Sequence, residues 1–254
     1  MMSFDDFKRF VDSIADEPIS EFNFSGGEPF ANPDVVSMIL YACEKLKCDI
    51  SCASNLSLIT DDQICRLANK PIKFNIQFPF ANENKFHKST GNGDYNRIVS
   101  TISKLREANI EVGLNTVIQQ NNEDDVREVI LFALNNELPL KLLPQIGGNC
   151  SAAYKDFVYP ILRECSTAFL NKGTGATRWI IEDGRHRTTV LYIDSPCFYK
   201  DIDTCRKFGE LRVLPDFSLQ SCVLRSSSNK LDLSCNKEGI ISQMNEVWST
   251  FKTC

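Results

Sequence analysis

The chain has 254 residues, 43% of them hydrophobic, which suits one α/β domain or one domain with a small appendage. Its net charge of −5 gives no basic surface for nucleic acid, and no apolar run reaches the length of a membrane-spanning helix. The sequence opens on an acidic, amphipathic segment without the features of a signal peptide. We therefore expect a cytoplasmic protein with no DNA or membrane partner.

Helical and strand patterns alternate along the first 150 residues, with short connections between them. The expected helices cover residues 4–15, 33–47, a segment after the capping box at Thr60–Gln63, 94–108 and 122–135. The expected strands cover residues 19–24, 49–53, 72–78, 111–118 and 140–143. This alternation predicts a parallel sheet with right-handed crossovers.

The pattern changes from Ser151 onward. A helix is expected to about Asn171, followed by a β-hairpin around Asp183-Gly184. A cysteine-bearing region follows, with a strand, a Pro-Asp turn and a strand over residues 211–219, and a helix from Gly239. We predict two parts of the chain, residues 1–150 and residues 151–254.

The segment Ser25-Gly26-Gly27-Glu28-Pro29 directly follows the first expected strand. Two glycines permit positive φ angles and leave room for a ligand to approach the backbone. Glu28 adds a carboxylate and Pro29 stiffens the exit from the turn. In β/α proteins, ligands bind at this carboxyl end of the strands.

This segment resembles the Gly-Gly-Glu-Pro motif of the radical S-adenosylmethionine (SAM) superfamily. Three later segments resemble parts of the same family, namely Ala53–Asn55, Phe86–Tyr95 and Leu114–Ile118, so that the resemblance spans about residues 19–120. Within the superfamily, the core is similar to the GTP 3′,8-cyclase and viperin families.

The resemblance implies an α/β fold: a partial (β/α)6 TIM-like barrel missing its first strand, followed by a small α+β cysteine-bearing region. It implies a SAM site in which the motif holds the methionyl amine. It also implies a 5′-deoxyadenosyl radical that modifies a peptide, nucleotide or small metabolite, with a flavodoxin- or ferredoxin-type reductant. The residues carried over to SAM binding are Gly26, Gly27, Glu28, Pro29, Ser54, Asn55, Gln77 and Asn115.

Three positions depart from the cyclase family. Asn23 and Gly113 stand where that family has an Arg and a Lys for nucleotide phosphates, and charge-assisted phosphate contacts need such cations. GTP is therefore disfavoured as the substrate. Gln77 stands where that family has a SAM-binding serine.

Eleven cysteines are present, and five of them lie in the last 60 residues or so, at 197, 205, 222, 235 and 254. The hairpin between Cys205 and Cys222 resembles the SPASM or twitch region of radical SAM enzymes, which binds an auxiliary [4Fe-4S] cluster. Phe217 replaces the glycine of the usual Asp-Gly turn. The four candidate iron ligands are Cys197, Cys205, Cys222 and Cys235. The alternative is that these cysteines are buried or adventitious thiols that bind no iron.

The sequence contains no Cys-x3-Cys-x2-Cys motif, which holds the catalytic [4Fe-4S] cluster in the family. Cys43, Cys48 and Cys52 have the wrong spacing and follow the glycine motif, so we interpret them as core thiols. We therefore expect that this polypeptide alone does not cleave SAM and is a truncated enzyme. The alternative is a catalytically inactive binding module that recognises a partner.

Overall fold

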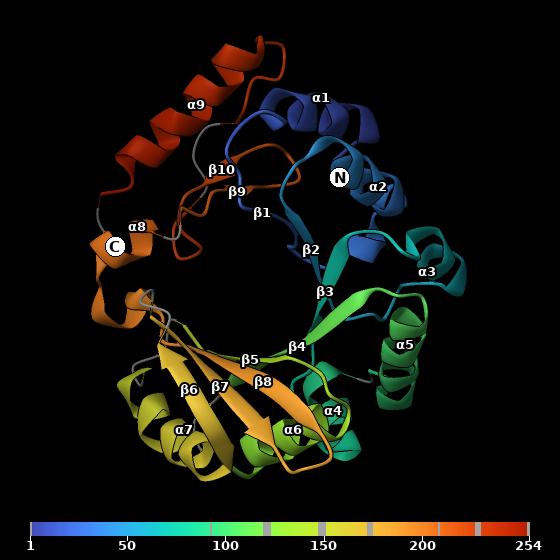
Figure 1. The fold of residues 1–254 in the computed structure, drawn as a ribbon. Helices are drawn as coiled ribbons and strands as arrows, with labels where there is room; N and C mark the ends of the chain where they lie inside the picture. The colour runs from blue at the N-terminus through green and yellow to red at the C-terminus, as the bar shows by residue number, and fades with distance from the viewer. Residues whose placement is uncertain are drawn as a thin grey trace.

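One curved sheet of eight strands organises the computed structural model, which describes residues 2–91, 93–118, 123–146, 151–171, 175–207, 209–226 and 230–252. The strands are β1 (Glu21–Phe24), β2 (Asp49–Ser54), β3 (Ile72–Gln77), β4 (Glu111–Ile118), β5 (Leu140–Pro144), β6 (Ser166–Asn171), β7 (Ala176–Glu182) and β8 (Arg187–Ile193). Their order in the sheet is β1-β2-β3-β4-β5-β8-β7-β6. Figure 1 shows the strands on the inner side of a ring and most helices on its outer side.

Six of these strands, β1 to β5 and β8, form a continuous parallel row. The five strands expected in residues 1–150 are all present, with bounds within about two residues of the predicted ones. In the described part of the chain the sheet does not close on itself, since β1 and β6 stand at its two ends. The fold is therefore a partial TIM-like barrel of the α/β class, as the sequence predicted.

The helices begin and end where local signals place them. Ser3 caps the first helix, whose residues Phe7, Phe10, Val11 and Ile14 are buried. The capping box at Thr60 and Gln63 is formed. The helices are α1 (Phe4–Ile14), α2 (Val35–Lys45), α3 (Asp61–Leu67), α4 (Glu83–Thr90), α5 (Tyr95–Glu107), α6 (Glu123–Asn135), α7 (Ser151–Cys165), α8 (Ile202–Lys207) and α9 (Lys237–Thr250), with single 3-10 turns η1 (Pro29–Ala31) and η2 (Pro196–Tyr199).

The expected helix over residues 151–171 is wrong in its last six residues. The helix α7 ends at Cys165, and residues 166–171 form β6 on the edge of the sheet. Thr167 and Phe169 favour a strand, and antiparallel pairing with β7 supplies the hydrogen bonds that this segment would otherwise make as a helix. The sequence analysis did not predict α4, although its two ends carry local signals: Asn82 caps the helix, and Gly91 ends it at a left-handed φ of 64°.

The C-terminal region packs against the beginning of the chain. The predicted hairpin is present as β9 (Arg212–Val213) and β10 (Leu219–Gln220), and the predicted final helix is α9. Phe217 lies 6.3 Å from Phe10 of α1 between ring centroids, and α9 runs beside α1 (Figure 1). Strands β6 to β8 extend the sheet of the first 150 residues, while the division of the chain into two parts stays a prediction.

Among the residues that the structure describes, no helix combines the length and apolar character needed to span a membrane.

Candidate functional site

The glycine turn after β1 is held in place by the carboxylate of Glu28. Glu28 Oε1 accepts hydrogen bonds from Ser54 Oγ at 2.7 Å and from the Phe30 N–H at 3.2 Å, and Oε2 accepts from the Asn55 N–H at 2.9 Å. These bonds join the end of β1 to the end of β2. Charge-assisted bonds of this kind are the stronger ones in proteins, so the turn is fixed by its own acid.

The two glycines of this turn face open space. Gly26 has a φ of 117°, a conformation that L side chains rarely adopt, and a Cβ added to Gly26 or Gly27 would meet nothing within 4 Å. Pro29 is buried at the start of η1. The exposed backbone of the turn is therefore open to a ligand at the carboxyl end of the sheet.

A row of amide side chains continues along this edge. Asn55 directly follows β2, Gln77 is the last residue of β3, and Gln77 pairs in register with Asn115 of β4. Asn115 Oδ1 is buried and has no hydrogen-bond partner among the described residues, whereas Gln77 and Asn55 are exposed. The structure thus brings the predicted residues at the ends of the first three strands level with Asn115, which lies within β4 and carries an unsatisfied acceptor among the described residues.

Polar and charged side chains line the same face of the strands below this edge. On β3, Lys73 and Asn75 alternate with buried residues and so share a face with Gln77. Lys73 forms an ion pair with Glu111, Lys141 Nζ donates to Asn75 Oδ1 at 3.1 Å, and Ser51 Oγ donates to Glu21 at 2.5 Å. Burial lowers the pKa of Lys141, and the nearby Glu21 carboxylate partly opposes this shift.

Gly113 lies opposite Asn75 in the register of β3 and β4. A Cβ at Gly113 would lie 3.3 Å from the Pro139 carbonyl oxygen, which is a tight contact, and 3.7 Å from Lys73 Cε, which is an ordinary one. Lys141 on β5 reaches across β4 to Asn75 on β3. The sequence analysis did not single out Lys73 or Lys141, although the alternation of polar and apolar residues on both strands was a signal for an inward polar face.

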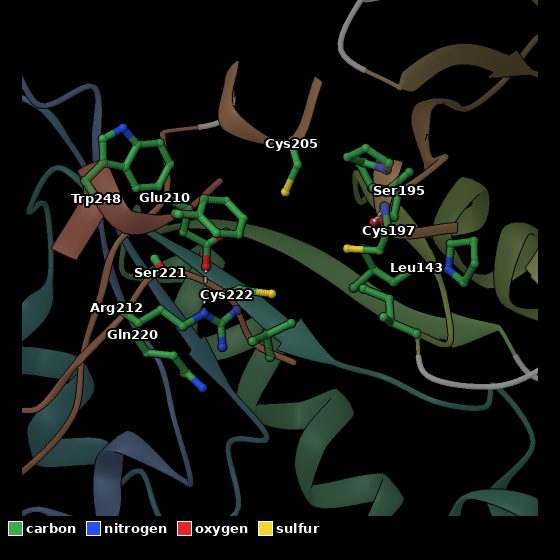
Figure 2. Close-up of a pocket in the computed structure, with 16 residues that line it drawn as sticks. Leu143, Ser195, Cys197, Cys205, Glu210, Arg212, Gln220, Ser221, Cys222 and Trp248 are labelled. Carbon is green, nitrogen blue, oxygen red and sulfur yellow. Dashed lines mark hydrogen bonds and ion pairs between the residues drawn. The ribbon is translucent and has the colours of Figure 1, made fainter. Parts of the chain in front are cut away.

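Three of the four predicted iron ligands line one pocket. Cys197 of η2, Cys205 of α8 and Cys222 after β10 surround a cavity of about 310 Å³. Figure 2 shows their thiol groups directed toward the middle of this cavity. The walls also include Trp248 and the ion pair between Glu210 and Arg212, whose Oε1 and Nε atoms are 2.8 Å apart.

The fourth predicted ligand, Cys235, does not line this pocket. It is exposed before α9, where its thiol donates to Asp232 Oδ2 at 3.6 Å. Cys254 lies outside the described residues. In the described ranges, no three Cys, His, Asp or Glu side chains converge closely enough for a single metal ion.

The cysteines near the glycine turn do not form a cluster site either. Cys52 is fully buried, and burial raises its thiol pKa, as it does for the partly buried Cys43 and Cys48. Cys52 belongs to the hydrophobic core, and Cys43 and Cys48 pack against that core. These positions fit the interpretation of the three cysteines as core thiols.

Comparison with known proteins identifies the superfamily of this chain. The sequence model of the Radical SAM superfamily matches residues 1–133. The chain belongs to the radical SAM superfamily.

Particular relatives are distant. The GTP 3′,8-cyclase of Clostridium perfringens is 24% identical over 237 residues, an alignment that covers 88% of this chain and 71% of the cyclase. The crystal structure of Streptococcus suis SuiB bound to S-adenosylmethionine superposes with a TM-score of 0.65 and 12% identity, over 89% of this chain and 55% of SuiB. SuiB bound to its precursor peptide SuiA gives the same TM-score at 11% identity and the same coverage. The chain thus spans little more than half the length of SuiB.

Proposed function

We propose that this chain binds SAM at the carboxyl edge of β1 to β4. The observation that carries the proposal is the turn fixed by Glu28, which leaves the backbone of Gly26 and Gly27 open at the place where the family binds the methionyl amine. Glu28 accepts three hydrogen bonds from protein groups and so holds the turn, with Pro29. A carboxylate can accept a further bond, so we assign Glu28, together with the exposed backbone of the glycines, to the methionyl amine.

The remaining residues of the proposed site suit the nucleoside part of SAM. Asn115 Oδ1 is a buried acceptor without a donor in the described structure, and a ribose hydroxyl is such a donor. Gln77 lies beside Asn115 in register, and Asn55 lies at the end of the neighbouring strand. Ser54 contributes by fixing Glu28.

Calorimetric titration with SAM tests this site through Glu28→Gln and Asn115→Ala. Glu28→Gln weakens the bonds that hold the turn, so we expect SAM affinity to fall by about tenfold to a hundredfold, equivalent to about 1.5–3 kcal/mol for bonds to a charged group. Glu107→Gln, an exposed glutamate on α5, is the matched control and should bind as the wild type does. Equal affinity of the wild type and both site variants would refute the proposed site.

We further propose that Cys197, Cys205 and Cys222 hold an auxiliary [4Fe-4S] cluster. Three thiols around one largely apolar cavity of about 310 Å³ support this proposal, because thiolates are the usual protein ligands of such clusters. A cluster is larger than a single ion, so its ligands do not converge on one point. When bound, it would supply an electron-transfer or Lewis-acid centre.

Anaerobic reconstitution with iron and sulfide tests the auxiliary site. We expect about four irons per chain, the content of one [4Fe-4S] cluster. Cys222→Ala should lose this iron, while Cys65→Ala, at an exposed cysteine of α3, should retain it. Iron retained by Cys222→Ala, or absent from the wild type, would exclude this set of ligands.

The catalytic cluster does not fit the residues present, and we derive no reaction step through it. We propose that radical chemistry requires three thiolates in addition to those of the printed sequence, on the same polypeptide or on a partner, and a flavodoxin- or ferredoxin-type reductant. The alternative, a binding module without radical chemistry, is favoured by the same lack of cluster thiolates. The cytoplasmic location stays a prediction.

For the substrate, we propose a peptide or a small polar molecule in preference to a nucleoside triphosphate. Asn23 and Gly113 provide no cation, Lys73 is paired with Glu111, and Arg212 is paired with Glu210, whereas Lys141 on the same face donates to the neutral Asn75. A single lysine does not match the charge of a triphosphate. The peptide bound by SuiB gives precedent for a peptide on this fold.

A further inference from the structure

A side-chain clamp outside the SAM edge joins α7 to η2. Lys155 of α7 forms an ion pair with Asp194, the residue that follows β8, through Oδ2. The hydroxyl of Tyr199, the last residue of η2, donates to Asp194 Oδ1 at 3.2 Å. One carboxylate therefore binds a helix on one side and the end of a turn on the other.

Aromatic rings enclose the cation of this clamp. Lys155 Nζ lies 5.6 Å from the ring centroid of Tyr159 and 5.9 Å from that of Tyr199, distances typical of cation–π contacts. The side chain of Asp194 is only 14% exposed. An exposed ion pair contributes little, but removing the cation here would leave a mostly buried carboxylate without its partner.

Cys197 lies between the two clamp residues Asp194 and Tyr199 in the chain and is partly exposed. Ser195 Oγ accepts from the Cys197 N–H at 3.3 Å, and the Lys200 N–H donates back to the Cys197 carbonyl at 3.4 Å. On the other side, the Asp194 N–H donates to the Gly175 carbonyl at 2.5 Å. The segment from Asp194 to Tyr199 is thus tied to α7, to the start of β7 and to itself.

Gly175 shows how closely this segment is packed. Its φ is 76°, and a Cβ there would lie 2.4 Å from the Asp194 carbonyl oxygen, which is closer than real contacts allow. The backbone at Asp194 therefore has little freedom to shift toward β7. The remaining freedom of the segment lies on the side of α7, where Lys155 holds it.

We infer that Lys155 is a positioning residue which, through Asp194 and Tyr199, holds the thiol of Cys197 toward the cysteine pocket. The role of the Cys197 thiol in binding iron rests on the proposed auxiliary cluster. The orientation of this thiol does not depend on the cluster, because it is a property of the iron-free protein.

Thiol labelling of the reduced, iron-free protein tests the clamp directly. Iodoacetamide labelling of Cys197 is followed by mass spectrometry of its peptide, with Cys235 in the same molecule as the internal reference. In Lys155→Met we expect Cys197 to react about fivefold faster than in the wild type, while the rate of Cys235 stays unchanged. The reason is that loss of the ion pair between Lys155 and Asp194 makes local opening of this segment easier. Lys155→Arg should restore the slower rate.

Two further variants separate positioning from general destabilisation. Lys104→Met removes another ion pair, between Lys104 and Asp61 at 2.7 Å, that is exposed and distant in sequence, and should leave Cys197 labelling unchanged. Tyr199→Phe removes only the hydroxyl bond to Asp194 and should accelerate Cys197 labelling while thermal unfolding stays at the wild-type temperature. Wild-type labelling rates in both Lys155→Met and Tyr199→Phe would overturn the inference.

Reconstituted protein gives a second readout. If iron binds, the electron paramagnetic resonance spectrum and midpoint potential of the cluster should change in Lys155→Met and return in Lys155→Arg. Failure of the wild type to bind iron would refute the auxiliary cluster and leave the labelling result to decide the clamp. Iron binding with unchanged labelling and an unchanged spectrum in Lys155→Met would refute the clamp and leave the cluster.

Discussion

Phe217 lies in the turn between β9 and β10, at the position where an Asp-Gly turn has its glycine. Its φ of 67° lies in the left-handed region, which costs an L residue about 1 kcal/mol or more relative to glycine. The ring is 5% exposed and packs near Phe10 of α1. Burial of the aromatic ring thus offsets the unfavourable backbone conformation at this position.

Two substitutions at Phe217 separate these effects. Phe217→Ala should lower the free energy of unfolding by about 3–5 kcal/mol, the usual cost of removing a buried ring. Phe217→Gly loses the same ring but relieves the left-handed backbone, so it should be more stable than Phe217→Ala by about 0.5–1 kcal/mol. Urea unfolding followed by circular dichroism measures both values, and an alanine variant as stable as the glycine variant would contradict this account.

At the scale of elements, a side-chain hydrogen bond joins α1 and α2 in addition to their apolar contacts. Tyr41 OH of α2 donates to Asp12 Oδ1 of α1 at 2.6 Å. This hydrogen bond raises the pKa of Tyr41 to about 12, with further contributions from desolvation and from the charge of Asp12. The phenol stays protonated because its proton is shared with a carboxylate.

The pH dependence of this contact has a defined sign. Since the folded pKa of Tyr41 is raised, its contribution to stability is complete below about pH 10, the pKa of an unperturbed tyrosine, and is lost as pH rises toward about 12. Ultraviolet titration of phenolate absorbance should show a late transition that is missing in Tyr41→Phe. The stability difference between wild type and Tyr41→Phe should shrink over the same range, and a constant difference from pH 8 to pH 12 would contradict the prediction.

At the scale of the whole molecule, β8 decides how the two predicted parts of the chain depend on each other. It follows α7 and β7 in sequence, yet it pairs parallel with β5 through Leu140, Lys141 and Leu142. The row of parallel strands therefore runs across residue 150, the boundary predicted from composition. Elements on both sides share one sheet.

A shared sheet predicts one cooperative unfolding transition for the sheet. Of the two tryptophans, Trp179 is buried in β7, so Trp248→Phe leaves a single fluorescence probe in the second part of the sheet. Its urea transition should coincide with the transition seen by far-ultraviolet circular dichroism. Two separate midpoints would instead support two independent domains at the boundary predicted near residue 150.

Local signals were sufficient for most of the elements and for the position of the sheet edge at which we propose that SAM binds. The helix caps at Ser3 and Thr60 and the strand preceding Gly26 depend on residues within a few positions of each other, and all are present in the structure. Asn55 after β2, Gln77 at the end of β3 and Asn115 within β4 lie at one level of the sheet because these parallel strands run in register. Their roles in SAM binding stay predictions.

The sequence by itself therefore determined the alternation of helices and strands and the motif that places this chain among radical SAM proteins, since both depend on short-range patterns. Only the tertiary structure decided that residues 166–171 pair as a strand, that Lys141 reaches Asn75 across β4, and that Cys197, Cys205 and Cys222 share a pocket without Cys235. Such contacts join residues far apart in the chain, and they follow from the register and curvature of the whole sheet, which no local pattern encodes.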